Sequence, residues 1–330
     1  MTLEVGFDTT ALVQTQAGTA RYINSLLGEL RGRSDISLHY RSFGGEGRAW
    51  NLPRDAVWYP FVLQHATRAV DVLHCPTYRG PVGAHAPLVV TVHDLAIFRY
   101  PHAFNRWSRL YAPVLVPRVL RAARRLIAVS EFTRRELSDL FDVPTTKIRV
   151  IPNAVDPAFT PDGASAAGDY VLAVGTLEPR KNLGRVMQAS SRLGIELRVV
   201  GARGWGRSVD MGDNGVRWVG RVSDDELAAL YRGARVVVYA SLYEGFGIPV
   251  LEAMACGVPV VTSLGGATEE TAGGAAELVD PLDPAAIAAG IERALERREE
   301  LVPRGLDRAG SFKWPDVAAR TIEVYREAAG

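Results

Sequence analysis

The chain contains few cysteines and no long hydrophobic run, and each shortage excludes a class of protein. Its two cysteines, Cys75 and Cys256, lie far apart in apolar surroundings without the spacing of metal ligands. This pattern predicts reduced, packed thiols in a cytoplasmic protein rather than a disulfide framework. No apolar run approaches the roughly 18 residues that cross a bilayer. Residues 1–8 lack a basic region followed by an apolar stretch, so they predict a strand and not a signal peptide.

The chain also lacks an excess of charge of one sign, since it contains 38 Lys+Arg and 37 Asp+Glu. We therefore expect no nucleic-acid partner. The halves differ, since residues 1–150 carry 19 basic and 12 acidic side chains and residues 151–330 carry 19 and 25. Such a basic patch suits an anionic membrane surface or a phosphate-bearing acceptor. The alternative interpretation is a solvated face of arginine-rich helices. Six arginines make up much of the patch: Arg118, Arg121, Arg124, Arg125, Arg134 and Arg135.

Short apolar runs alternate with amphipathic stretches, which predicts an α/β protein with parallel sheets flanked by helices. With 330 residues, 47% hydrophobic and 23% charged, the chain is long enough for two globular domains. Helices are predicted at 19–30, 223–232, 249–255, 284–297 and 315–328. Six strands are predicted in each half, at 3–7, 36–40, 70–74, 88–92, 125–129 and 149–151, and at 170–174, 195–200, 216–218, 236–239, 258–262 and 276–279.

Prolines and glycines between Asp156 and Gly168 interrupt this alternation and predict a domain boundary. We therefore expect an N-terminal Rossmann-like domain over residues 1–156 and a C-terminal one over residues 157–314. The two domains are expected to face each other across a central cleft. Residues 315–330 follow the second predicted sheet as a final helix.

The most informative segment runs from Glu244 to Glu252 and reads EGFGIPVLE. Two carboxylates bracket a glycine-containing loop between a β-branched strand and a helix, in which Pro249 suits the first position. Gly245 and Gly247 let backbone N–H groups approach a ligand, and the helix N-terminus adds a positive dipole end. The loop therefore suits a diphosphate or a hydroxyl-rich sugar. Glu252 is expected in the first helical turn, where its alternative role is only to complement the dipole.

Arg180 and Lys181 form a second candidate site, shortly after the predicted strand 170–174. An arginine can chelate two phosphate oxygens and a lysine adds a mobile point charge, so the pair would stabilise a departing diphosphate. The alternative interpretation is an ordinary surface pair. Further along, Ser223 and Glu226 have the spacing of a capping box, and the glycine-rich segment 199–206 is interpreted as a loop bordering the site.

The run from Ser241 to Val261 resembles the E-x7-E signature of the retaining glycosyltransferases of family 4. Further similarity extends from a loop at Gly18 to residues 312–314. In this resemblance Arg180 and Lys181 take the place of the donor-phosphate motif, although Thr176 stands where many relatives carry an arginine.

Three further elements are similar to family motifs. The Gly18 loop would bring a backbone N–H to the donor phosphates, and His93, at the end of strand 88–92, would contact the donor sugar. The backbone at Arg221 and Val222 would hold the base. The alternative role of His93 with Asp94 is a structural hydrogen-bonded pair.

The resemblance implies the two-domain GT-B fold, with the last helix crossing back to the first domain. It implies transfer of a sugar from a nucleoside diphosphate to an acceptor hydroxyl with retention at the anomeric carbon. Glu252 would bind the ribose and Glu244 the donor sugar, while backbone N–H groups of Phe246, Gly247 and Ile248 hold hydroxyls or phosphate. The catalytic residues would be Glu244, His93, Arg180 and Lys181.

No metal or other cofactor is expected, because the two cations and the helix dipoles can do a metal ion's work. The donor would be GDP-mannose, as in similar mannosyltransferases, or a UDP-sugar. The acceptor would be a glycan, a lipid-linked sugar or a small molecule, reached by a cytoplasmic protein with peripheral contact to the inner membrane face. Two alternatives stay open: a sugar-nucleotide epimerase of the same architecture and a non-catalytic sugar-nucleotide sensor.

Overall fold

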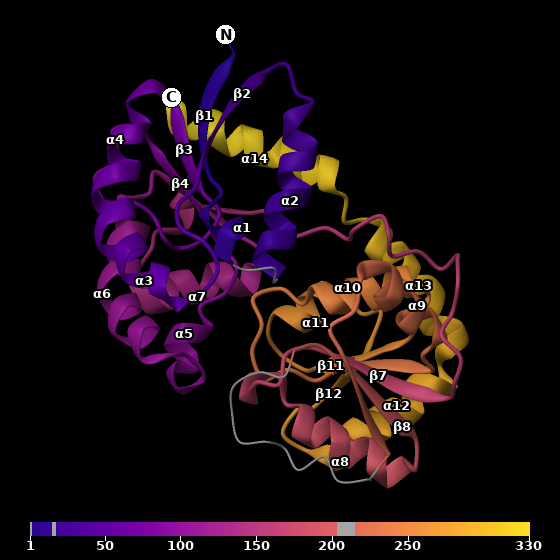
Figure 1. Ribbon diagram of the computed structural model, residues 1–330. Coiled ribbons are helices and arrows are strands. Elements are labelled where there is room, and N and C mark those ends of the chain that lie inside the picture. Colours follow the sequence, from indigo (N-terminus) through magenta and orange to yellow (C-terminus); the bar gives the residue numbers. More distant parts are fainter. Residues whose placement is uncertain (1, 15–17, 203–214) are drawn as a thin grey trace. The chain divides into compact units, whose positions relative to one another are not determined.

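The computed structural model describes residues 2–14, 18–202 and 215–330, and it divides into two compact units (Figure 1). Unit 1 comprises Met1–Arg99, Phe104–Asn153 and Trp314–Gly330, and unit 2 comprises Tyr100–Ala103 and Ala154–Lys313. Each unit is built around one six-stranded sheet in which all neighbouring strands are parallel.

The sheet of unit 1 has the strand order β2-β1-β3-β4-β5-β6. Strands β3 and β4 are buried at every residue, as expected of a parallel sheet that is covered on both faces. Their valine and leucine residues supply apolar surface that the flanking helices cover. The strands are β1 (Leu3–Asp8), β2 (Ile36–Arg41), β3 (Val72–Cys75), β4 (Leu88–Val92), β5 (Arg125–Ala128) and β6 (Ile148–Val150).

The helices of unit 1 include one segment of π-helix, η2, which has Pro60 in its interior. Helix α6 likewise contains two prolines, Pro113 and Pro117, and its N-cap Asn105 accepts a hydrogen bond from the backbone N–H of Ser108. The helical segments are α1 (Thr10–Gln14), α2 (Gly18–Arg31), α3 (Asn51–Pro53), η2 (Arg54–Leu63), α4 (Gln64–Ala66), α5 (Ala96–Arg99), α6 (Arg106–Ala122), α7 (Glu131–Phe141) and α14 (Trp314–Ala329).

Helix α14 is the last element of the sequence but packs within unit 1, against α2, β3 and β4. Its Glu327 carboxylate accepts hydrogen bonds from Arg125 on β5 (3.0 Å) and from Arg149 on β6 (3.1 Å). On its buried face, the Tyr325 hydroxyl lies 2.7 Å from Nδ1 of His74 on β3. These contacts fix the end of the chain to three strands of the first sheet.

The sheet of unit 2 has the strand order β12-β11-β10-β7-β8-β9. The helices pack their aliphatic residues against the valines of β7, β8 and β10 in one core. The strands are β7 (Tyr170–Val174), β8 (Glu196–Val200), β9 (Val216–Gly220), β10 (Val236–Tyr239), β11 (Val260–Ser263) and β12 (Glu277–Val279). The helices are α8 (Leu183–Leu193), α9 (Asp224–Gly233), α10 (Ile248–Ala255), α11 (Ala267–Ala272), α12 (Pro284–Glu296) and α13 (Arg298–Gly310).

The predicted secondary structure is largely confirmed. All twelve predicted strands are present, each within two residues of its predicted bounds, and so are the five predicted helices. The capping box of Ser223 and Glu226 is formed at the start of α9. Cys75 and Cys256 are both buried and free, as expected of packed thiols.

Candidate functional site

The candidate site of unit 2 lies where the order of its strands reverses. From β7 the chain proceeds outward through β8 and β9, and it then returns to β10 on the other side of β7. In open α/β sheets, ligands bind at such a point, beyond the carboxyl ends of the two adjacent strands. The loop after β7 carries Arg180 and Lys181, and the loop after β10 carries Glu244. The topology therefore brings two distant motifs of the sequence to one crevice.

Arg180 and Lys181 both contact the Glu244 carboxylate. Lys181 Nζ donates to Glu244 Oε1 (2.6 Å), and an Arg180 terminal nitrogen donates to Oε2 (3.0 Å). Arg180 Nε donates to a second carboxylate, that of Glu178 (3.0 Å), and Lys181 lies 4.9 Å from the ring centroid of Tyr239. The side chains of Arg180, Lys181 and Glu244 are each 10–15% exposed.

These ion pairs favour the charged forms of Glu244 and Lys181. Burial by itself would raise the pKa of Glu244, but Lys181 and Arg180 outweigh burial and lower it. Burial would likewise lower the pKa of Lys181, and Glu244 outweighs burial and raises it. The two cations, which pair with the carboxylates of Glu244 and Glu178, are of the kind that binds an anion such as a diphosphate.

Local backbone contacts fix the two loops to each other. Asn182 adopts a left-handed conformation (φ 58°), and its side-chain amide donates to the carbonyls of Ala240 and Pro281. The backbone N–H of Leu242 donates to the Arg180 carbonyl (2.7 Å). The cation pair and the loop of Glu244 are therefore held together by their main chains as well as by the salt bridges.

Helix α10 begins at Ile248, directly after Gly247, whose φ of 104° a side chain rarely adopts. A Cβ at Gly247 would also approach Thr268 to 3.0 Å, so this glycine permits both the turn and the close packing. Phe246 precedes it, and its carbonyl accepts a hydrogen bond from Thr271 (2.7 Å). The backbone at Gly247 and Ile248 thus forms the start of an eight-residue helix.

The expected position of Glu252 in the first helical turn is wrong. Because α10 starts one residue earlier than predicted and Pro249 takes the second position, Glu252 is the fifth helical residue, and the first turn holds no acidic residue. The side chain does not serve the helix dipole in the way proposed as the alternative. Glu252 is 2% exposed, and its Oε2 accepts a hydrogen bond from the Tyr231 hydroxyl of α9 (2.9 Å).

Arg221 and Val222 lie between β9 and the capped start of α9, at the same edge of the sheet. This is the carboxyl end of an outer strand, two strands away from β7. Of the glycine-rich segment 199–206, residues 203–206 lie outside the described residues. Its first part ends β8, where the Gly175 N–H donates to the Val200 carbonyl (2.8 Å).

The remaining predicted site residues, Gly18 and His93, belong to unit 1. Gly18 is the exposed first residue of α2, and the neighbouring Gln16 and Ala17 lie outside the described residues. His93 follows β4 directly, and its Nε2 lies 3.0 Å from the Pro76 carbonyl. Burial lowers the pKa of His93, and the Tyr22 ring packs edge-on against its ring at 4.7 Å. His93 is therefore held as a neutral donor at the carboxyl edge of the sheet.

A buried network behind His93 was missed by sequence reasoning. His74 on β3 is fully buried, with Nδ1 2.7 Å from the Tyr325 hydroxyl and Nε2 2.8 Å from Oγ1 of Thr91. Thr91 is in turn 3.5 Å from the Tyr22 hydroxyl. A polar residue within an otherwise apolar strand was the available signal, but its partners lie 17 and 251 residues away.

As the pH falls, the free energy of unfolding is expected to decrease more steeply for the wild type than for the His74→Gln variant. Burial, aided by His93, lowers the pKa of His74 to about 3, against about 6.5 in an unfolded chain. Its contribution to stability is therefore complete above pH 6.5 and is lost as the pH falls toward 3, by about 1.4 kcal/mol per pH unit. Urea unfolding between pH 7 and pH 4 measures the slope. The exposed His102→Gln is the control, and equal slopes for His74→Gln and the wild type would contradict the assignment.

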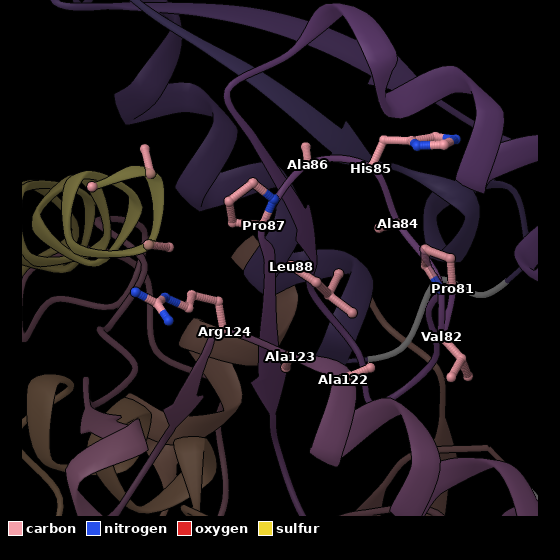
Figure 2. A pocket seen from close by; sticks show the side chains of 13 residues that line it. Pro81, Val82, Ala84, His85, Ala86, Pro87, Leu88, Ala122, Ala123 and Arg124 are labelled. Carbon is pink, nitrogen blue, oxygen red and sulfur yellow. The ribbon is translucent and has the colours of Figure 1, made fainter.

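An open cavity of about 600 Å³ lies at the other edge of the unit 1 sheet (Figure 2). Leu88, the first residue of β4, lines it together with Pro87, Ala123 and residues at the end of α14. Its lining side chains are mostly small and apolar, apart from His85 and Arg124. This cavity is separated from His93 by the length of β4.

Within the described residues, no three His, Cys, Asp or Glu side chains gather as a metal site would require. No helix in the described part of the chain is long and apolar enough to cross a bilayer.

Two family models match the chain, the first mostly in unit 1 and the second in unit 2. Residues 17–159 match "Glycosyltransferase Family 4", and residues 168–297 match "Glycosyl transferases group 1". The first match contains Gly18 and His93, and the second contains Arg180, Lys181, Glu244 and Glu252.

Individual proteins agree with these models. The O-antigen chain mannosyltransferase B of Escherichia coli is 35% identical over 72% of this chain and 70% of its own length. A D-inositol 3-phosphate glycosyltransferase of Kineococcus radiotolerans is 32% identical over 80% of this chain and 73% of its own length. Among solved structures, Anabaena HepE in complex with UDP-glucose superposes with a TM-score of 0.77 over 98% of this chain and 99% of that chain, at 17% identity.

Proposed function

This chain belongs to the family 4 glycosyltransferases, and from that premise we propose that the loops after β7 and β10 bind a nucleoside diphosphate sugar for transfer with retention. It is a glycosyltransferase with two parallel α/β sheets of the GT-B type. The observation that carries the proposal is the contact of the Glu244 carboxylate with both Lys181 and Arg180 at the switch point of the second sheet. Nothing supports the epimerase or sensor alternative.

In this proposal the diphosphate is bound by Arg180, Lys181 and the backbone N–H groups at the start of α10. As the bond from the anomeric carbon to the diphosphate breaks, negative charge accumulates beside the two cations, which stabilise it. The base is held by the backbone at Arg221 and Val222, and the ribose by Glu252. Unit 2 would thus be the donor-binding domain, and unit 1, with α14 returning to it, the acceptor-binding domain.

Glu244 is proposed to position the donor sugar rather than to attack it. A carboxylate that accepts hydrogen bonds from a lysine and an arginine is a weak nucleophile, because its lone pairs are engaged and its pKa is lowered. A front-face reaction avoids this difficulty. In that reaction the acceptor oxygen bonds to the anomeric carbon, and its proton passes to the leaving diphosphate oxygen. His93 and the Gly18 N–H would contact the donor from unit 1.

We propose GDP-mannose as the first donor to test, because the E. coli relative is named a mannosyltransferase. A UDP-sugar is the second choice, since the Anabaena structure holds UDP-glucose. The acceptor is proposed to be a glycan, a lipid-linked sugar or a small molecule. Slow donor hydrolysis, screened across nucleotide sugars without acceptor, tests the proposal. One sugar should be released several times faster than the others, and no hydrolysis of any donor, with an epimerised sugar recovered instead, would contradict it.

Activity should survive thorough chelation, because Arg180 and Lys181 neutralise the diphosphate in place of a metal ion. The measurement is transfer or donor hydrolysis after dialysis against EDTA, with an untreated sample as control. Abolition by the chelator, with recovery on adding magnesium or manganese, would contradict this prediction.

We further propose peripheral contact with an anionic membrane through α6. Residues 56–130 contain nine arginines and two aspartates, and α6 exposes Leu110 (72%) and Val114 (50%) beside Arg118. The predicted patch narrows, because Arg125 and Arg134 are paired with Glu327 and Glu131. Arg118, Arg121, Arg124 and Arg135 remain exposed, and the first three lie on or directly after α6. A cytoplasmic enzyme would use such a face to reach a lipid-linked acceptor.

Neutralising Arg118, Arg121 and Arg124 together to glutamine should weaken binding to vesicles of phosphatidylglycerol roughly a hundredfold, at about 1 kcal/mol per arginine. Wild-type binding should itself fall as salt rises, since screening acts over about 8 Å at physiological ionic strength. Vesicle sedimentation measures both effects, and Arg192→Gln with Arg217→Gln, both exposed in unit 2, is the control. If the wild-type protein does not bind these vesicles at low salt, the proposal is contradicted and the arginines form only a solvated surface.

A further inference from the structure

Unit 1 has a switch point of its own, and an arginine stands beside it. The strand order β2-β1-β3-β4 makes β1 and β3 neighbours from which the chain proceeds in opposite directions. The crevice beyond their carboxyl ends is where an open α/β sheet binds a ligand. Asp8 is the last residue of β1, and Arg79 lies four residues after the end of β3.

Arg79 makes no hydrogen bond through its guanidinium to any described residue. Its side chain is 23% exposed, and its Nε is buried without a hydrogen-bond partner. The guanidinium carbon lies 5.6 Å from the ring centroid of Tyr78 and 5.4 Å from that of Tyr111. Of the five N–H donors of a guanidinium, the one on Nε is buried without an acceptor, which is costly. The terminal N–H groups make no hydrogen bond to a described residue, and the partly exposed side chain leaves them available to a ligand. The faces of the two tyrosine rings attract the positive charge of the guanidinium. They do not accept the hydrogen bonds that its N–H groups donate in the guanidinium plane.

The nearest carboxylate is already engaged. Asp55 Oδ1 accepts from Arg54 Nε (2.7 Å), while Oδ2 accepts from Arg54 (2.8 Å) and from Trp107 Nε1 (2.8 Å). Arg79 Nε approaches Asp55 Oδ1 only to 3.7 Å. Two arginines therefore share one carboxylate, and the site keeps a positive charge.

The other nearby acid, Asp8, has partners of its own. Asp8 accepts from the Tyr59 hydroxyl (3.1 Å) and from the backbone N–H of Thr10 (3.0 Å), and burial raises its pKa.

The backbone that carries Arg79 is held in place. Its N–H donates to Oγ1 of Thr77 (3.3 Å), and a Cβ at the next residue, Gly80, would approach the Cys75 sulfur to 3.2 Å. Strand β3 ends at Cys75, two residues before Thr77. The carbonyl of Pro76, which lies between them, accepts a hydrogen bond from His93 Nε2. Arg79 is thus fixed on the segment that also holds the proposed sugar-contacting histidine.

We propose that Arg79 binds a phosphate group of the acceptor substrate, which makes a phosphorylated sugar or a lipid-linked sugar phosphate the acceptor class of this enzyme. The inference rests on the proposed function, because it assigns the acceptor to unit 1. Phosphate oxygens match the planar fork of a guanidinium and can accept two parallel hydrogen bonds from it.

Binding of inorganic phosphate to the full chain tests this site. Phosphorus NMR or calorimetry is performed with the donor site saturated by GDP or UDP, so that Arg180 and Lys181 are occupied. Phosphate should still bind to the wild type, and Arg79→Gln should weaken this binding at least tenfold. Arg79→Lys should recover part of it, and Arg109→Gln, an exposed arginine on α6, is the matched control. Thermal unfolding of each variant checks that it is folded.

No phosphate binding to the saturated wild type, or binding that Arg79→Gln leaves unchanged, would overturn the proposal. A loss of GDP and UDP affinity in Arg79→Gln would also overturn it, since Arg79 would then belong to the donor site. Failure of the wild type to bind or hydrolyse any nucleotide sugar is a separate result, which refutes the proposed function instead.

The source of the phosphate is distinguished by two probes. Glycerol 3-phosphate represents a soluble phosphorylated acceptor, and neutral vesicles that carry a polyprenyl phosphate represent a lipid-linked one. The source is identified by the probe that the Arg79→Gln variant binds at least tenfold more weakly than the wild type does. If neither probe responds to this substitution, the proposal fails.

Discussion

Glu244→Gln is expected to lower turnover about ten- to a hundredfold while leaving the affinity for free GDP or UDP unchanged or higher. The loss corresponds to one buried hydrogen bond involving a charged group, about 1.5 to 3 kcal/mol. Removing the carboxylate leaves Arg180 and Lys181 without the anion that now pairs with both. A diphosphate should then meet a more positive crevice, so binding is not expected to suffer.

Glu178→Gln is the matched control, because the Glu178 carboxylate also accepts a hydrogen bond from Arg180, whereas Lys181 contacts Glu178 only through the main chain, and Glu178 lies outside the loop after β10. It should lower turnover much less. Steady-state rates and calorimetry with free nucleotide measure the two effects separately. Equal and negligible losses for both variants would remove Glu244 from the proposed mechanism.

Glu252→Ala is expected to weaken GDP or UDP binding about ten- to a hundredfold, and to lower turnover at saturating donor much less. In the proposed role this carboxylate accepts hydrogen bonds from the ribose, so its loss affects binding of nucleotide and nucleotide sugar alike. The substitution should also reduce the free energy of unfolding, because it leaves the buried Tyr231 hydroxyl without its Glu252 partner.

Tyr231→Phe separates the two consequences. It removes the same internal hydrogen bond but keeps the carboxylate, so it should reproduce part of the stability loss with little change in nucleotide affinity. Calorimetry and urea unfolding on both variants provide the comparison. If Tyr231→Phe weakens nucleotide binding as much as Glu252→Ala does, Glu252 is only a structural partner of α9.

The strands could be predicted because a parallel sheet buried on both faces requires continuous apolar runs, such as Val236–Tyr239, that stand out in the sequence. The exact ends of the helices are harder to predict, because they depend on the backbone conformation of single residues. The start of α10 depends on the backbone of Gly247, and a shift of one residue moved Glu252 out of the first turn. Helix α6 has prolines at 113 and 117 and carried no clear helical signal.

The partners within the site could not be predicted from sequence. That Glu244 meets Arg180 and Lys181 follows from β10 lying beside β7, which is a fact of strand order. The same holds for Tyr231 with Glu252, and for His74 with Tyr325 of the last helix. Arg79 belongs to no local motif, and its unpaired Nε could not be predicted, because it depends on Asp55 being engaged by Arg54 and Trp107.

The central claim is that the loops after β7 and β10 form the diphosphate site, and calorimetric titration of GDP and UDP into Lys181→Ala tests it most directly. Lys181 donates hydrogen bonds to Glu244 and to the Tyr239 hydroxyl, whereas Arg192, exposed at the other end of α8, serves as the control. The account predicts one saturable site in the wild type and in Arg192→Ala, with affinity at least tenfold weaker in Lys181→Ala. Undiminished nucleotide binding by a folded Lys181→Ala would contradict it.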